Sequence, residues 1–130
     1  MNAILLVLSF IVSAHAAPQA GVPKEARRHF IKAVAIQKDA KQASDYELAI
    51  GEYVEALNLA PNYGAARYNL AVALEAAGRY DDAMAQFKEY LKLNPKDADA
   101  VEDKIAAIEG RLELAKKREK QGRNGRESSE

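Results

Sequence analysis

The sequence predicts an all-α fold in which two antiparallel helix hairpins stack and a final amphipathic helix covers the end of the stack. Three observations lead there: a 34-residue internal repeat, apolar side chains at helical spacing in each half of it, and a proline closing each copy. The chain has 130 residues, of which 48% are hydrophobic. This size and composition suit one packed domain and argue against wholesale disorder.

The repeat appears as matching residue types at a constant offset. Pro61 and Pro95 lie 34 positions apart. The same offset joins further pairs in the same order: Ile36 and Leu70, Tyr46 and Tyr80, Ala49 and Ala83, Tyr53 and Phe87, Leu57 and Leu91, Leu59 and Leu93. One cycle of sequence therefore corresponds to one structural unit.

The second cycle, residues 64–97, has a characteristic order of residue types. Leu70 precedes a small residue, Ala83 is followed four positions later by Phe87, and Pro95 closes the cycle. In this order the chain resembles the tetratricopeptide repeat family, whose pattern has Leu-Gly on the first helix, then Ala-x-x-x-Phe and a closing proline on the second.

The first cycle, residues 30–63, keeps Ala49, Tyr53 and Pro61 of that pattern. The departures from the family are Ile36-Gln37 at the Leu-Gly position of the first cycle, and Arg67 and Leu74 at the usual aromatic positions of the second. The resemblance implies a right-handed α-solenoid of antiparallel helix hairpins with a C-terminal capping helix. It also implies a role in protein–protein interaction.

Helix ends can be placed from local signals. The expected helices cover about 23–43, 46–59, 63–77, 80–93 and 97–120. Ser44 and Glu47 have the S-x-x-E form of a capping box. Gly78 can adopt the left-handed conformation that ends a helix. Pro61 and Pro95 cannot continue the preceding helix, so each is expected to force a turn.

Small and ring-bearing side chains are predicted to meet inside the hairpins. Three alanines, Ala49, Ala56 and Ala83, would let helices approach to about 8–10 Å. Four aromatic residues are expected to fill the remaining volume: Tyr46, Tyr53, Tyr80 and Phe87.

The last helix has one apolar stripe, which is spaced 4, 3, 4 and 3 residues apart: Val101, Ile105, Ile108, Leu112 and Ala115. Its other sides are charged, as expected of a helix that covers the end of a repeat stack. A dimerising coiled coil would need more sustained heptads on this stripe. The basic residues near 116–120 suit the helix dipole. Residues 121–130 have no apolar periodicity and are predicted to form a disordered tail.

The N-terminal segment reads as a targeting signal. The run from Ile4 to Val12 is too short for a membrane span of about 20 residues but suits the core of a secretory signal peptide. Ala14 and Ala16 form an A-x-A site, which predicts cleavage after Ala16, a short tether over 17–22, and a helical domain over 23–120. An uncleaved anchor and a true start upstream are the alternatives, because no lysine or arginine precedes the run.

Composition excludes several chemistries. Without cysteine there can be no disulfide or thiolate site, and two histidines make a multi-histidine metal site improbable. The 19 basic and 19 acidic residues balance, so nothing favours nucleic acid as a partner. No phosphate loop or nucleophile motif appears. We expect no enzymatic activity, no cofactor, no metal and no membrane span in the mature chain.

The resemblance to the family places a partner-binding trough along the first helices of the two hairpins. The residues expected to line it are Val34, Lys38, Lys41, Tyr68, Asn69, Val72 and Glu75. Tyr68 offers an aromatic platform beside the Asn69 amide, which could bond a peptide backbone as donor and acceptor. Simple packing of Tyr68 against the first helix and solvation of Lys38 and Lys41 are the alternatives.

Some family members hold a partner's C-terminal carboxylate with a lysine–asparagine clamp. Asn69 matches one clamp position, but Val34 and Lys38 stand where lysine and asparagine would be needed. That specificity is therefore not predicted. The favoured function is a non-catalytic interaction module of an exported protein, periplasmic or secreted, which binds a partner peptide or helix. A self-associating scaffold element of an envelope or secretion assembly, such as a homodimer, is the alternative.

Overall fold

The computed structural model describes residues 21–127. The described part contains helices and no strands: α2 (Lys24–Asp39), α3 (Ala43–Leu59), α4 (Gly64–Ala76), α5 (Tyr80–Leu91) and α6 (Ala98–Glu127). The predicted all-α fold is confirmed. The predicted signal peptide, positions 17–20 of the tether and residues 128–130 lie outside the described residues.

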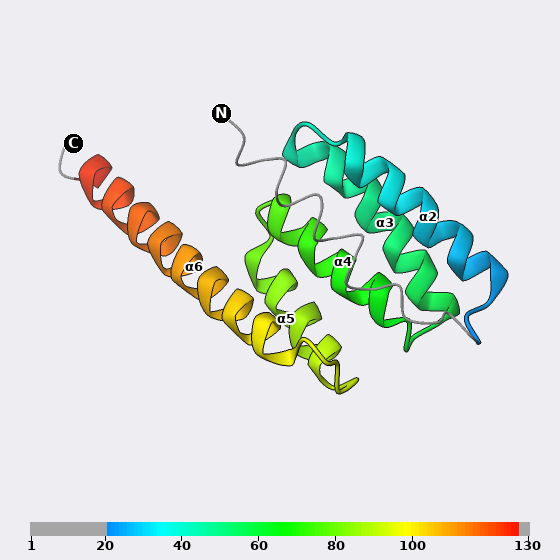
Figure 1. Cartoon of the computed structure of the whole chain (residues 1–130). Coiled ribbons are helices and arrows are strands. Elements are labelled where there is room, and N and C mark those ends of the chain that lie inside the picture. Colours follow the sequence, from blue (N-terminus) through cyan, green and yellow to red (C-terminus); the bar gives the residue numbers. More distant parts are fainter. Residues whose placement is uncertain (1–20, 128–130) are drawn as a thin grey trace, which may run out of the picture.

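The helices pack in the order of the chain (Figure 1). Helices α2 and α3 form the first hairpin, α4 and α5 form the second, and α3 packs against α4 to join them. Helix α6 packs against α5, while α2 also touches α4. This sequential stacking is the helical solenoid that the repeat predicts, with α6 at its C-terminal end.

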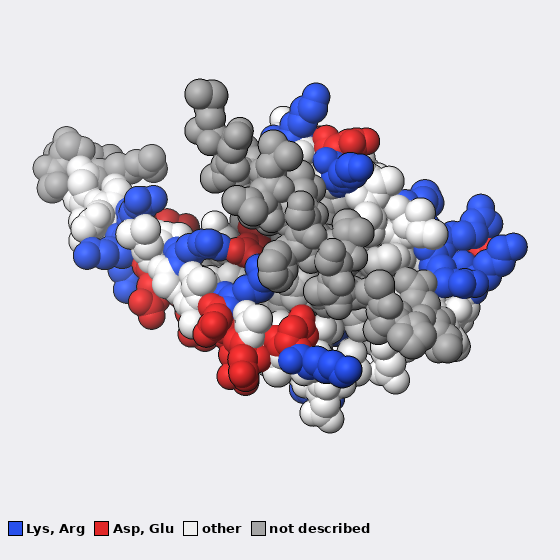
Figure 2. Space-filling view, viewed as in Figure 1, with Lys and Arg blue, Asp and Glu red and all other residues white. Residues whose placement is uncertain are grey.

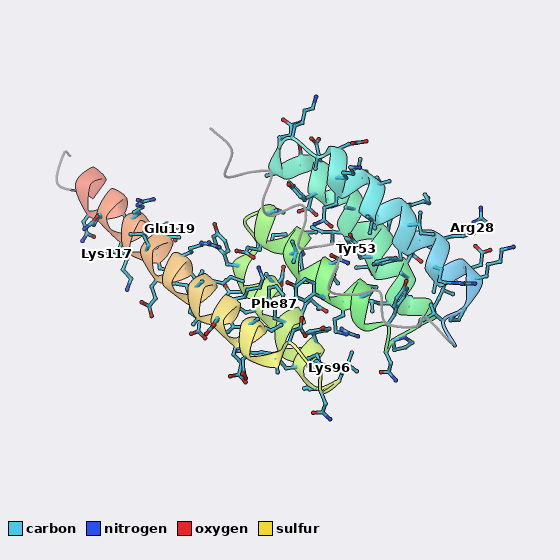
Figure 3. The ribbon with its side chains drawn as sticks, viewed as in Figure 1. Arg28, Tyr53, Phe87, Lys96, Lys117 and Glu119 are labelled. Atoms are coloured by element: carbon cyan, nitrogen blue, oxygen red, sulfur yellow. The ribbon has the colours of Figure 1, made fainter. Side chains whose placement is uncertain are left out.

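The two repeat-related aromatic residues occupy equivalent buried places. Tyr53 on α3 and Phe87 on α5 are both 0% exposed and lie in the interior of their hairpins (Figure 3). The three helix-contact alanines, Ala49, Ala56 and Ala83, are fully buried as predicted. The outer pair of tyrosines at the starts of α3 and α5 is only half-buried, packed against this core.

The first hairpin turns earlier than predicted. Helix α2 ends at Asp39 instead of near 43, and α3 begins at Ala43 instead of near 46. The predicted capping box on Ser44 is wrong, because Ser44 lies inside α3 and the capping box is built on Gln42 and Asp45. Glu47 instead forms an ion pair with Arg79 at the start of α5, with 3.1 Å between Oε2 and Nη1.

The carboxylate of Asp45 stabilises the start of α3. It accepts hydrogen bonds from the backbone N–H groups of Lys41, at 2.9 Å, and Gln42, at 3.2 Å. The bond from the Lys41 backbone is the main reason that the pKa of Asp45 lies below its ordinary value. An acidic residue here also suits the positive end of the helix dipole.

Both turns of the second repeat use left-handed backbone. Gly78, between α4 and α5, has φ of 79°, as its position predicts. Asn94, which precedes Pro95, has φ of 51° and is the only non-glycine residue among those described with positive φ. Asparagine tolerates this conformation better than most residues. Helix α5 therefore ends before Pro95, and the proline could not have continued the helix in any case.

Helix α6 is longer than the sequence suggests. It continues to Glu127, through the first seven residues of the segment predicted to be a disordered tail. Val101, Ile105 and Ile108 are buried, and Leu112 and Ala115 are half-buried, so the predicted apolar stripe is confirmed. Beyond Ala115 the helix extends past the other helices (Figure 1). Within residues 21–127, no helix combines the length and apolar character that a membrane span requires.

Candidate partner-binding site

The predicted trough residues lie mostly on two helices that touch each other. Val34 and Lys38 are one turn apart on α2, and Tyr68, Val72 and Glu75 follow helical spacing along α4. We call these five residues the α2–α4 face. Its apolar members, Val34, Tyr68 and Val72, are half-buried against the core, whereas Lys38 is exposed. Lys41 lies in the loop after α2, because that helix ends early, and so does not line this face from a helix.

Tyr68 is held by α5 instead of by the first helix. Its ring makes edge-on contacts with Phe87, at 5.5 Å between centroids and 72° between planes, and with Tyr90, at 5.4 Å and 62°. Such geometry is favourable for aromatic pairs. Burial, and then the carboxylates of Asp97 and Glu75, raise the pKa of Tyr68 above its usual value. The ring is therefore a neutral, fixed platform that is only partly open to solvent.

Asn69 lies in the core beneath the α2–α4 face and is not open to a ligand. Its side chain is 1% exposed, and Nδ2 donates to the backbone oxygen of Ala65 at 3.0 Å, one turn earlier in α4. Its Oδ1 is buried without a hydrogen-bond partner. We expected the amide to serve a peptide as donor and acceptor, but the structure buries it in the core, with one N–H bonded within its own helix. The folded surface therefore does not present the Asn69 amide to a ligand.

Glu75 forms an ion pair with another helix. Its carboxylate pairs with the guanidinium of Arg111, which joins α4 to α6. Glu75 is half-buried and Arg111 is largely exposed. The pair neutralises the one acidic member of the α2–α4 face, which leaves Lys38 as its uncompensated charge. Sequence reasoning missed Arg111, because two charges 36 positions apart give no local signal.

A buried polar bond explains one departure from the family pattern. Gln37 occupies the place of the usual glycine, and its Oε1 accepts a hydrogen bond of 2.6 Å from the Tyr53 hydroxyl. Gln37 is only 8% exposed. Glutamine at this position, unlike glycine, therefore gives the buried Tyr53 hydroxyl a hydrogen-bond acceptor. Gln37 belongs to α2 directly before Lys38, so this bond also fixes the first-hairpin side of the α2–α4 face.

A charged cluster ties α2 to α3 near the beginning of the hairpin. The Glu52 carboxylate lies 2.6 Å from Lys32 Nζ and 2.6 Å from His29 Nδ1. The hydrogen bond from Lys32, and then the one from His29, lower the pKa of Glu52 below its ordinary 4.5. A depressed carboxyl pKa stabilises the fold above that ordinary value, and the contribution is lost as the pH falls through the folded-state pKa.

We expect Glu52→Gln to lower the free energy of unfolding at pH 7 by about 0.5–1 kcal/mol. The deficit should shrink as the pH falls below 4.5, because wild-type Glu52 then becomes protonated as well. Urea unfolding at pH 7 and pH 3 measures this. Glu55→Gln, an exposed carboxylate on the same helix, is the control. A deficit that stays the same at both pH values would contradict the assignment.

No metal site is indicated among residues 21–127, where no group of three or more histidine or acidic side chains is placed to hold an ion. The charged groups of the α2–α4 face are the exposed Lys38 and Glu75, which is neutralised by Arg111. Lys38 can bind an acidic group.

A family model described as tetratricopeptide repeat matches residues 40–108, more than half of the 130-residue chain. The match spans α3, α4, α5 and the packed first part of α6. It includes the α4 side of the face, whereas Val34 and Lys38 precede it. No curated protein and no solved structure matches the chain.

Proposed function

The chain belongs to the tetratricopeptide repeat family, a family of protein–protein interaction modules, and from this premise we propose that it is non-catalytic and binds a partner peptide or helix along the α2–α4 face. The observation that carries the proposal is the set of half-buried apolar side chains on two touching helices, Val34 on α2 and Tyr68 and Val72 on α4, with the Tyr68 ring held by Phe87. A partner segment laid along the two helices would bury these side chains further.

The chemistry of the face defines the partner segment. Val34 and Val72 offer half-buried apolar contacts on opposite helices, so the segment should place an apolar side chain over them. Lys38 is exposed one turn from Val34 and has no ion pair among the described residues. Because Arg111 neutralises Glu75, a nearby acidic group on the partner would meet Lys38 without repulsion.

We also propose that the protein is exported, periplasmic or secreted, and that the mature chain begins after Ala16. The apolar run and the A-x-A site support this. Intact-mass measurement on protein purified from its native cell tests it. A mass that lacks residues 1–16 is expected, and a mass that includes them would refute cleavage there.

The binding proposal is tested by recovering partners with the purified protein, identifying them by mass spectrometry, and titrating the responsible segment by calorimetry. Lys38→Glu should weaken binding about tenfold, because an acidic group on the partner would then meet a like charge. Tyr68→Ala combined with Asn69→Ala should abolish detectable recovery. Circular dichroism must show that each variant keeps its helix content.

Asn58→Ala, at an exposed position near the end of α3, is the matched control and should bind like wild type. Equal recovery of every partner by wild type and the Tyr68, Asn69 double variant would refute binding at the α2–α4 face.

A further inference from the structure

Helix α6 has a second face that the single chain does not use. Val101, Ile105 and Ile108 turn one side of α6 to the core. On the opposite side, residues recur at spacings of 4, 3, 4, 3 and 4, and we call them the outer face: Asp103, Ala107, Gly110, Leu114, Lys117 and Gln121. All six are exposed, and Leu114 keeps 48% of its surface accessible. Lys117 lies on the part of α6 that extends past the other helices (Figure 3).

Gly110, at the centre of this face, is not required to be glycine by packing within the single chain. A Cβ added there would meet nothing within 4 Å, and its backbone has no positive φ. Glycine in the middle of a helix costs about 1 kcal/mol relative to alanine. A glycine that intramolecular packing does not require is what close approach of a second helix would need.

The charges along α6 are separated by sign. Acidic residues dominate its first half, residues 98–113: Asp99, Glu102, Asp103, Glu109 and Glu113 against Lys104 and Arg111. Basic residues dominate the exposed stretch 116–125: Lys116, Lys117, Arg118, Lys120 and Arg123 against Glu119. Figure 2 shows acidic side chains over the beginning of the helix and basic ones toward its end. Two copies of such a helix have complementary charges when they lie antiparallel, because the acidic half of each faces the basic half of the other.

We propose that the outer face of α6 pairs antiparallel with α6 of a second copy of this chain, about a two-fold axis at Gly110. Positions equally distant from Gly110 on either side then face each other. Lys117, seven residues after it, meets Asp103 of the second copy, seven residues before it, and the contact occurs twice. Leu114, four residues after Gly110, packs over Ala106 of the second copy, which lies four residues before it. The two Gly110 residues let the helices approach closely.

The charge pattern selects both the orientation and the occupant. In a parallel pair, Lys117 of one chain would face Lys117 of the other, and Asp103 would face Asp103. Both contacts bring like charges together and are repulsive. An anionic membrane would attract the end of α6 but repel its acidic first half. A second copy satisfies both halves at once. Because the outer face lies opposite α5, the two solenoids would sit on opposite sides of the helix pair and leave each α2–α4 face free.

Sedimentation equilibrium of the purified protein tests this pairing. We expect a dimer at about 50 mM salt that dissociates progressively by about 500 mM, since screening weakens paired charges. Lys117→Glu should raise the dissociation constant at least about tenfold, because both Lys–Asp contacts become repulsive. Exchanging the two charges in one variant, Asp103→Lys with Lys117→Asp, should restore it to within about threefold of wild type.

Lys116→Glu, the same charge change on a different side of the same helix, is the control and should dimerise like wild type. The proposal is wrong if the wild type is monomeric at low salt, if Lys116→Glu and Lys117→Glu act alike, or if the charge exchange fails to rescue. It is also wrong if dimerisation is lost in Ile31→Glu but kept in Lys117→Glu. That outcome would place the contact on the first hairpin, where Ile31 is 65% exposed. None of these results depends on partner binding at the α2–α4 face.

Discussion

Replacing Phe87 with alanine is expected to lower the free energy of unfolding by about 3–5 kcal/mol. The ring is 0% exposed and contacts Tyr68 at 5.5 Å. It lies on α5, the helix that joins α4 to α6, so the cavity would loosen both contacts. Small domains have total stabilities of about 5–15 kcal/mol, and a loss of this size would leave much of the protein unfolded near physiological temperature.

Urea unfolding followed by circular dichroism measures the effect of Phe87→Ala. Leu48→Ala is the control, because Leu48 is 67% exposed and its truncation should change stability by less than about 0.5 kcal/mol. A loss of under about 1 kcal/mol for Phe87→Ala would mean that the ring does not fill the interior of the second hairpin.

Replacing Tyr53 with alanine is expected to cost about 3–5 kcal/mol, and replacing it with phenylalanine about 1–2 kcal/mol. The ring is fully buried and lies 6.0 Å from Phe30, and its hydroxyl donates to Gln37 at 2.6 Å. Tyr53→Phe keeps the ring but leaves Gln37 Oε1 buried without its donor. The loss of stability in Tyr53→Phe measures the hydrogen bond alone. The additional loss in Tyr53→Ala measures the cavity that the missing ring leaves.

A double-mutant cycle makes the hydrogen-bond part of that expectation sharper. Gln37→Met together with Tyr53→Phe removes both partners of the bond and should cost less than the two single changes added together. The free energies come from the same urea unfolding experiment. Strict additivity would show that Gln37 and Tyr53 are not energetically coupled, contrary to the 2.6 Å contact.

The solenoid was predictable because its determinants repeat. Tyr53 and Phe87 share an offset of 34 residues and the same fully buried environment, so one packing rule applied twice places both. The turn at Gly78 was also predictable, since a left-handed residue is a local requirement. Repeats, small residues and glycine turns act over a few positions, and sequence patterns report such short-range constraints well.

The details of the candidate site were less predictable, because they depend on competition between partners. Asn69 was expected to offer both ends of its amide to a partner, but the structure buries the side chain and bonds Nδ2 to the carbonyl of Ala65 one turn away. Ser44 and Glu47 match a capping box, yet Gln42 and Asp45 make it instead, since α3 begins at Ala43. The pairing of Glu75 with Arg111 depends on how α6 lies beside α4, which no local pattern specifies.

The end of α6 shows a different limit. Apolar periodicity stops at Ala115, and the sequence therefore predicts that order ends soon after. The helix nevertheless continues to Glu127, and its residues 116–125 are exposed. Backbone hydrogen bonds and good helix-forming residues such as Lys116 and Lys120 favour the helical state there without burial. Hydrophobic patterning reports packing, so it cannot register a helix that projects into solvent.

Nuclear magnetic resonance titration of the labelled protein with its identified partner segment tests the binding face most directly. If the partner lies along α2 and α4, backbone signals around Val34, Tyr68 and Val72 should shift, because these half-buried side chains become covered. Shifts confined to α3 or to the far half of α6, with these three residues unchanged, would contradict recognition by the first helices of the hairpins.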